Sequence, residues 1–261
     1  MLLFGLFLAV VLAALLTFAE LRAGDRLSVD RLSNCAVWAA RFTVSWALLP
    51  LVSLSLPICL IDGRTLPFVA ASALYFVAMD AGEYAFHRAQ HALPGLWRLH
   101  ALHHSDPDIN ATTTERHFWG DQLIKSVTIW PAAALIIRPT PGMLVVYIVI
   151  SLWNYVSHSR LPLNFGRLSW LLNSPAYHRR HHSVLPEHYN SNFAAVLPIW
   201  DLMFGTYRRP SGGMPPTGLG GIPPSAIEML AWPLVRGSRV PAVNPTSALL
   251  GTASTKPRSP R

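Results

Sequence analysis

The stretch HRAQHALPGLWRLHALHH, residues 87–104, holds five histidines among eighteen residues, with Pro94 and Gly95 between them. A second group, HRRHH, follows at residues 178–182. Residues three and four apart are neighbours on a helix, so each group places its rings on one helical face. The stretch 87–104 therefore predicts two helices, turned at Pro94 and Gly95, whose imidazoles face a common centre.

Three histidine boxes contain eight of the eleven histidines of the chain. They are His87 and His91; His100, His103 and His104; and His178, His181 and His182. Burying so many imidazoles without partners would be costly, so the pattern favours metal binding over a structural or pH-sensing role. Imidazole ligates Zn, Cu, Fe and Ni, which leaves the metal open, but eight rings are too many for one ion and suit two.

Other metalloprotein classes fit less well. A zinc protease needs HExxH, and Arg88 occupies the position of its Glu. A bis-histidine haem protein would place its ligands on facing transmembrane helices. A metal transporter would carry polar residues inside its spans, which these apolar runs nearly lack. The net charge of +8 is dispersed and has no nucleic-acid-binding motif; it fits a basic surface near anionic lipid headgroups, and we expect no nucleic-acid partner.

Long apolar runs predict a membrane protein. Residues 2–19 contain no charge and are long enough to cross a bilayer as a helix. They lack the basic n-region and clear cleavage site of a signal peptide, so we expect a retained anchor. Further runs occupy 35–61, interrupted only by Arg41, then 66–79, 123–137 and 142–157, with the turn sequence RPTPG between the last two. These runs predict an all-α, multi-span membrane bundle of about four to five transmembrane helices.

Basic residues in the short loops predict the orientation. Arg22, Arg26 and Arg31 follow the first run, whereas the loops at 62–65 and 138–142 carry one Arg each. Placing the first loop in the cytoplasm puts 80–122 and everything after 157 on that side too. We therefore predict an integral membrane protein with a histidine-rich helical cap, holding a dinuclear metal site on the cytoplasmic face.

The chain divides into three predicted regions. Residues 1–65 form an N-terminal transmembrane region, 66–208 a domain that carries the histidine boxes, and 209–261 a Pro/Gly-rich tail in which we expect loops and disorder. The only two cysteines, Cys35 and Cys59, lie in the second apolar run and predict neither a disulfide framework nor a cysteine metal site.

Two acidic residues, Asp80 and Glu83, share a helical stripe with His87 and His91. Carboxylates in this position orient ligand rings and offset the charge of a metal held by neutral imidazoles. The alternative is that they only mark where the helix leaves the membrane.

The boxes HRAQH, HALHH and HRRHH resemble, in order, those of the fatty acid hydroxylase / sterol desaturase superfamily of integral-membrane di-iron enzymes. The surrounding sequences DAGEYAFHRAQH, LWRLHALHHSDPDINATTTERH, SPAYHRRHHS and NSNFAAVLPIWDLMFGTY are similar as well, over residues of about 70–208. The short distance between the first two boxes favours the hydroxylases over the acyl desaturases. His158 matches a lone family histidine, His117 lies one place earlier than another, and His188 matches none and is expected at the surface.

The resemblance implies an O₂-dependent lipid hydroxylase or desaturase with two iron ions, whose sites zinc also occupies in purified protein. It implies nine metal ligands: His87, His91, His100, His103, His104, His158, His178, His181 and His182. His117, Asp80 and Glu83 are further candidates as ligands or as partners of ligands. The chain carries no cysteine set for an iron–sulfur cluster, so we expect electrons from a ferredoxin or cytochrome b5-like protein with an NAD(P)H reductase. The alternative function is a non-catalytic membrane metal-binding protein for storage or sensing, and the lipid itself stays open.

Overall fold

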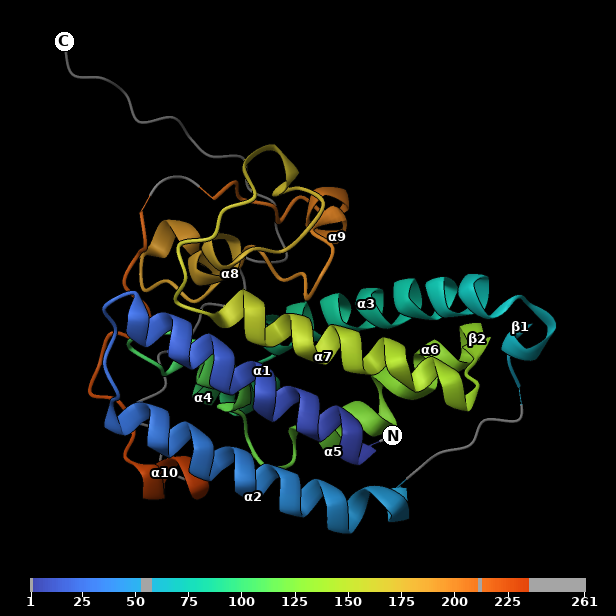
Figure 1. The fold of residues 1–261 in the computed structure, drawn as a ribbon, viewed down its shortest axis with the longest axis horizontal. Coiled ribbons are helices and arrows are strands. Elements are labelled where there is room, and N and C mark those ends of the chain that lie inside the picture. Colours follow the sequence, from blue (N-terminus) through green and yellow to red (C-terminus); the bar gives the residue numbers. More distant parts are fainter. Residues whose placement is uncertain (1, 53–57, 211–212, 235–261) are drawn as a thin grey trace.

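The computed structural model describes residues 2–52, 58–210 and 213–234. Four long helices run lengthwise through the molecule (Figure 1): α1 (Leu2–Arg22), α2 (Val29–Val52), α3 (Phe68–Ala92) and α7 (Leu144–His158). The shorter helices are α4 (Pro94–His104), α5 (Asp121–Val127), α6 (Ile129–Ile136), α8 (Pro175–His181), α9 (Ile199–Met203) and α10 (Ala226–Leu230). Strands β1 (Ile61–Asp62) and β2 (Ile137–Arg138) form one short parallel pair. The predicted helical class is confirmed.

The histidine-bearing helices meet at one end of the molecule. α3 ends at Ala92 because Leu93 is extended, with φ −102° and ψ 120°, as expected before a proline. Pro94 then begins α4, where its missing N–H and fixed φ suit the first helical turn. The ends of α1, α3 and α7 lie near α4 and α8 (Figure 1).

The main core lies between α3, α6 and α7, away from the histidines. Met79, Ile137, Met143 and Ile150 are almost fully buried there. Gly82 of α3 allows α6 to approach closely, because a Cβ at this position would lie 2.9 Å from the side chain of Ile129. Truncating a buried side chain such as Met79 to Ala would destabilise the fold by about 2–5 kcal/mol. This core fixes α3 and α7 relative to each other, and with them the first histidine box and His158.

Among the described residues, one helix is long and apolar enough to cross a membrane, namely Phe4–Arg22 in α1. Phe4, Phe7, Leu15 and Phe18 on this helix face outward. The expected run 35–61 lies partly outside the described residues, because 53–57 are not described.

The expected span over 123–137 is wrong as a single helix. The chain breaks at Thr128, with φ −120° and ψ −77°, into α5 and α6. Pro131 explains the break, because proline lacks the N–H that a continuous helix would need and is tolerated in the first turn of a new one. The Thr128 hydroxyl also donates to the carbonyl of Ile124 at 2.7 Å, in competition with the helical pattern.

The expected loops after residue 209 are present in residues 213–225, but a short helix, α10, follows them and packs against the rest of the molecule. Ser225 and Glu228 form a capping box that begins α10. Met229 and Trp232 are buried against Val37 of α2 and Trp97 of α4, and the Trp232 indole donates to the carbonyl of Arg98 at 2.7 Å. Residues 235–261 lie outside the described part.

Buried ion pairs fasten the N-terminal helices to the histidine end. Arg31 of α2 donates to Glu20 of α1 at 2.8 Å, and both side chains are nearly inaccessible. The fully buried Arg116 donates to Ser105 after α4 and to Asn34 of α2. Removing one member of a buried pair leaves an uncompensated charge, at a cost of about 3–5 kcal/mol.

Candidate metal centre

Each of the predicted ligands lies on or beside a helix end. α3 carries His87 and His91 in its last two turns, and α7 ends at His158. α4 carries the second box in its C-terminal half. Ser174 caps the start of α8, where its hydroxyl accepts the backbone N–H of Tyr177, and α8 carries His178 and His181, with His182 directly after its end. These four chain segments converge on one centre.

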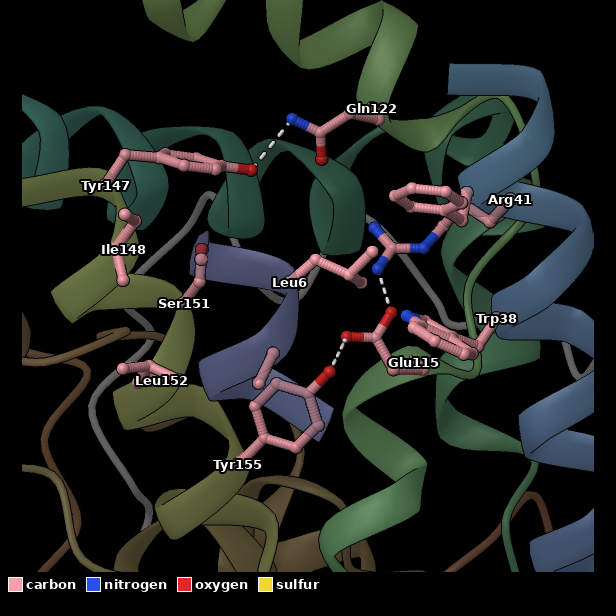
Figure 2. Close-up of a pocket in the computed structure, with 13 residues that line it drawn as sticks. Leu6, Trp38, Arg41, Glu115, Gln122, Tyr147, Ile148, Ser151, Leu152 and Tyr155 are labelled. Carbon is pink, nitrogen blue, oxygen red and sulfur yellow. Dashed lines mark hydrogen bonds and ion pairs between the residues drawn. The ribbon is translucent and has the colours of Figure 1, made fainter. Parts of the chain in front are cut away.

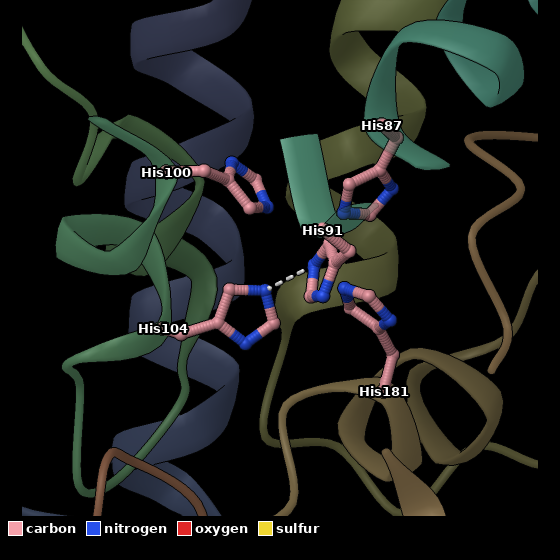
Figure 3. A group of neighbouring side chains, drawn as sticks. All are labelled: His87, His91, His100, His104 and His181. Carbon is pink, nitrogen blue, oxygen red and sulfur yellow. Dashed lines mark hydrogen bonds between the residues drawn. The ribbon is translucent and has the colours of Figure 1, made fainter. Parts of the chain in front are cut away.

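The nine rings form two groups. The potential ligand atoms within each group lie within 4.8 Å of one another. The first group, drawn in Figure 3, is His87, His91, His100, His104 and His181. The second group is His103, His158, His178 and His182.

The histidines of the second box, and likewise those of the third, are divided between the two groups. Adjacent residues on a helix point about 100° apart, so His103 and His104 of α4 face different groups. His181 and His182 divide in the same way. The two groups are in contact, because the rings of His104 and His182 stack with centroids 4.3 Å apart. The second box on α4 and the third box at α8 therefore each contribute to both groups, whereas both histidines of the first box belong to the first group.

The ring nitrogens converge as ligands of one ion would. Nε2 of His91 lies 3.1 Å from Nε2 of His104 in the first group. In the second group, Nε2 of His158 lies 3.0 Å from that of His103 and 2.9 Å from that of His178. Nitrogens about 2.1 Å from one ion, and at right angles, are separated by about 3 Å. These spacings fit a metal in each group.

Backbone carbonyls orient three of the rings. Nδ1 of His87 lies 2.8 Å from the carbonyl of Phe193, Nδ1 of His181 lies 2.8 Å from that of Ser191, and Nδ1 of His158 lies 2.7 Å from that of Asn154. A proton on Nδ1 leaves the Nε2 lone pair free for a metal. Nε2 of both His87 and His181 is buried and lacks a hydrogen-bond partner within the described part of the chain. Such buried orphans are rare, and a bound metal would satisfy them.

Burial keeps these imidazoles neutral. Desolvation, and after it the neighbouring rings, lowers the pKa of five histidines well below the usual value: His100, His103, His104, His178 and His182. Burial also lowers the pKa of His181 to about 4. Neutral imidazole is the form that ligates a metal.

Two further histidines lie outside both groups. His117 stacks on His103, with ring centroids 4.1 Å apart and planes 13° apart, and its Nδ1 lies 4.0 Å from Asp121. His188 is only 8% exposed, so its expected surface position is wrong. It lines a pocket together with Arg180, Pro210 and Met214.

The two carboxylates predicted beside the ligands have other partners. Asp80 accepts the backbone N–H groups of Val196 and Leu197 at 3.0 and 3.1 Å, and the Trp200 indole N–H at 2.8 Å. Glu83 pairs with Lys125 at 2.9 Å. Neither accepts a hydrogen bond from a histidine ring among the described residues. Asp80 instead holds the loop that carries the carbonyl of Phe193.

Sequence reasoning missed Asp201. This fully buried carboxylate accepts the backbone N–H groups of Phe193 and Ala194, each at 2.9 Å, and the hydroxyls of Tyr177 and Thr206. It therefore fixes the loop against α8. The sequence does contain a signal for this residue, namely a lone Asp inside the apolar stretch PIWDLMFG. An Asp in such a stretch is expected to be buried, and a buried carboxylate needs hydrogen-bond partners.

A small cavity of about 70 Å³ adjoins both histidine groups. Its walls include His87 and His100 of the first group, His103, His158 and His178 of the second, His117, and the Glu83–Lys125 pair. Small reactants have room beside both groups at this place.

Comparison with known proteins agrees with this geometry. Residues 72–206 match the fatty acid hydroxylase family, and the match contains all nine histidines of the two groups. The chain belongs to this family, as its three boxes indicated.

The relatives act on several lipids. An alkylglycerol monooxygenase of Xenopus tropicalis is 38% identical over 135 residues, which cover 51% of this chain and 30% of that protein. An ornithine lipid hydroxylase of Rhizobium tropici is 31% identical over 55% of this chain and 44% of its own length. A methylsterol monooxygenase of Arabidopsis thaliana is 28% identical over 53% and 48%. The match thus spans less than half of these relatives, and no solved structure matches the chain.

Proposed function

We propose that this protein is a membrane-bound di-iron oxygenase that hydroxylates or desaturates a C–H bond of a lipid, with O₂ and external electrons. The observation that carries the proposal is the convergence of three histidine boxes and His158 into two adjacent groups of neutral imidazoles. The family and the lipid oxygenases among its relatives support the same activity.

Two iron ions are the proposed cofactors, one held by each group, and zinc would bind to the same nitrogens. Iron held by these nitrogens would supply the activation of O₂ for attack on an unactivated C–H bond. The nitrogens of the chain hold the ions, and the carbonyls of Phe193, Ser191 and Asn154 keep three of the rings in position. Burial excludes water from the centre, which protects the reaction from side reactions.

The proposed substrate is a lipid, and the proposed electron donor is a separate ferredoxin or cytochrome b5-like protein. The printed names of the relatives include an alkylglycerol, an ornithine lipid and a methylsterol as substrates, so chain and headgroup differ widely among them. The basic residues near the α1–α2 loop offer a surface for an acidic donor.

We further propose four to five membrane spans and a cytoplasmic active site. α1 is apolar and faces outward, and the centre lies at the end of α1 where Arg22 and Arg26 follow. A single cysteine at the exposed Glu187 tests this orientation. An impermeant maleimide should label Glu187→Cys only after cells are permeabilised, in a background with Cys35 and Cys59 changed to Ser. Labelling of intact cells would place the centre on the other side.

Purified protein tests the activity. The full chain in detergent, loaded with ferrous iron and supplied with a reductant and oxygen-labelled O₂, should oxidise a lipid from a total membrane extract. Hydroxylation would add one labelled oxygen atom to one lipid class, and desaturation would remove two hydrogens. Absence of any oxidised lipid from the iron-loaded, reduced protein would contradict the proposal and favour a non-catalytic role.

A further inference from the structure

Arg41 is the one charged residue in an apolar run of α2, and the metal centre does not use it. It lies at the edge of a cavity between α1, α2 and α7, where its guanidinium pairs with Glu115. A charged residue within an apolar helical run is costly to bury, which makes Arg41 a candidate for a functional role.

The cavity has a volume of about 200 Å³ and mostly apolar walls (Figure 2). α1 contributes Gly5, Leu6 and Ala9 to it, so it begins beside the helix that is apolar enough to span a membrane. α7 lines it from Tyr147 to Tyr155, a rise of about 12 Å. An apolar cavity next to a membrane helix suits a hydrocarbon chain.

The inner end of this cavity adjoins the metal centre. Tyr155 lies one helical turn before His158 on α7. Glu115 and Tyr155 line the cavity, whereas the residues before them, Thr114 and Asn154, line the small cavity beside the histidines. The Thr114 hydroxyl donates to the carbonyl of Asn154 at 3.1 Å, so one layer of chain separates the two spaces.

The polar groups at this inner end carry no net charge. Glu115 accepts from Arg41 through one oxygen and from the Tyr155 hydroxyl through the other (Figure 2). Nε of Arg41 is buried and has no hydrogen-bond partner among the described residues. A hydroxyl both donates and accepts, so it can serve the arginine and the glutamate together. A carboxylate only accepts, and it would meet the negative charge of Glu115.

We propose that this cavity binds the polar end of a lipid whose headgroup is uncharged and hydroxylated, and that Arg41 and Glu115 select it over a carboxylate. The inference rests on the proposed lipid oxygenase function and adds to it the class of headgroup. Gly5, Leu6 and Ile148 line the part of the cavity that would receive hydrocarbon.

Binding to the zinc-loaded full chain in detergent tests the inference without turnover. The probes are a hexadecylglycerol ether and hexadecanoate, which share a chain length and compete with a fluorescent hydrocarbon. The unaltered protein should prefer the ether. Glu115→Gln leaves Arg41 uncompensated, so the preference should move toward hexadecanoate by about tenfold or more.

A matched control is Asp62→Asn, which makes the same charge change in an arginine–carboxylate pair, with Arg64, outside the cavity. It should leave the preference unchanged. Ser151→Phe fills the cavity without removing the ion pair, and it should weaken binding of the ether by about tenfold or more. Zinc content and melting temperature report whether each variant is folded.

An unchanged preference in Glu115→Gln, or undiminished ether binding in Ser151→Phe, would overturn the inference. Preference of the unaltered protein for hexadecanoate would do the same. Lipid oxidation without the selectivity would refute only this inference, whereas selective binding by a protein that oxidises no lipid would refute only the proposed function.

Discussion

The two histidine groups are held by different means, although they share α4 and α8. In the first group, the His87 ring on α3 bonds to the carbonyl of Phe193, 106 residues later in the chain, and the His181 ring on α8 bonds to that of Ser191 in the same loop. In the second group, the His158 ring bonds to the carbonyl of Asn154, four residues earlier in its own helix. The first group therefore depends on long-range placement of a loop, whereas the second depends more on local helical geometry.

The largest effect should follow loss of a ligand from either group. His181→Ala removes a nitrogen from the first group and His103→Ala one from the second. Each should lower lipid oxidation by more than about 100-fold, because loss of a group that only orients a ligand already costs about 10–100-fold. Iron per chain, measured by mass spectrometry of the metal, should fall from about two in both variants.

His188→Ala is the matched control, because His188 is also buried but lies outside both groups. It should keep the iron content of the unaltered protein. Retention of full iron in His103→Ala or His181→Ala would show that the groups are not the metal sites.

Removal of the metals should loosen the two groups unequally. Each buried nitrogen left without a partner costs about 1–3 kcal/mol, so a chelator should lower the melting temperature by several degrees. Hydrogen exchange should rise more in the loop 190–198 than at the end of α7, because only this loop holds the first group by long-range contacts. Adding zinc should restore the melting temperature. An equal rise of exchange in the two segments would contradict the claim that the two groups are held by different means.

A smaller and more selective effect should follow Asp201→Asn. The amide places an NH₂ group where the carboxylate accepts backbone N–H groups of the loop, so the loop should shift. The affinity of the first group for its metal should fall by about tenfold, while the second group should change little. A titration with cobalt, followed by absorption, resolves the two sites, and equal weakening of both would argue against separate supports.

The smallest effect is expected for His117→Phe. His117 stacks on His103 but belongs to neither group, so phenylalanine keeps the stacking and loses only the nitrogens. Iron content should stay unchanged. Loss of an iron would instead show that His117 is a tenth ligand.

The spacing of the boxes predicted much of this centre, because periodicity on a helix needs no tertiary information. The division of His103 from His104 could not be predicted, since it depends on how α4 packs between α3 and α8. The carbonyls that orient the rings could not be predicted either, because every residue has a backbone carbonyl and none is marked in the sequence. Asp80 lies on the predicted stripe yet holds the loop rather than a ring.

Two local signals in the sequence predict features of the fold that its composition does not. Pro131 in an apolar run predicts the break between α5 and α6. Ser225 followed by Glu228 is a capping box and predicts the start of α10 in the Pro/Gly-rich tail. The apolar composition of 123–137 and the Pro/Gly-rich composition of the tail led to the opposite expectations. A single helix-breaking or helix-starting residue is more informative than the composition around it.

Anomalous X-ray diffraction at the iron absorption edge, from crystals of the iron-loaded full chain, tests the central claim most directly. The account predicts two iron peaks: one among His87, His91, His100, His104 and His181, and one among His103, His158, His178 and His182. A single peak shared by both groups, or iron bound elsewhere, would contradict it.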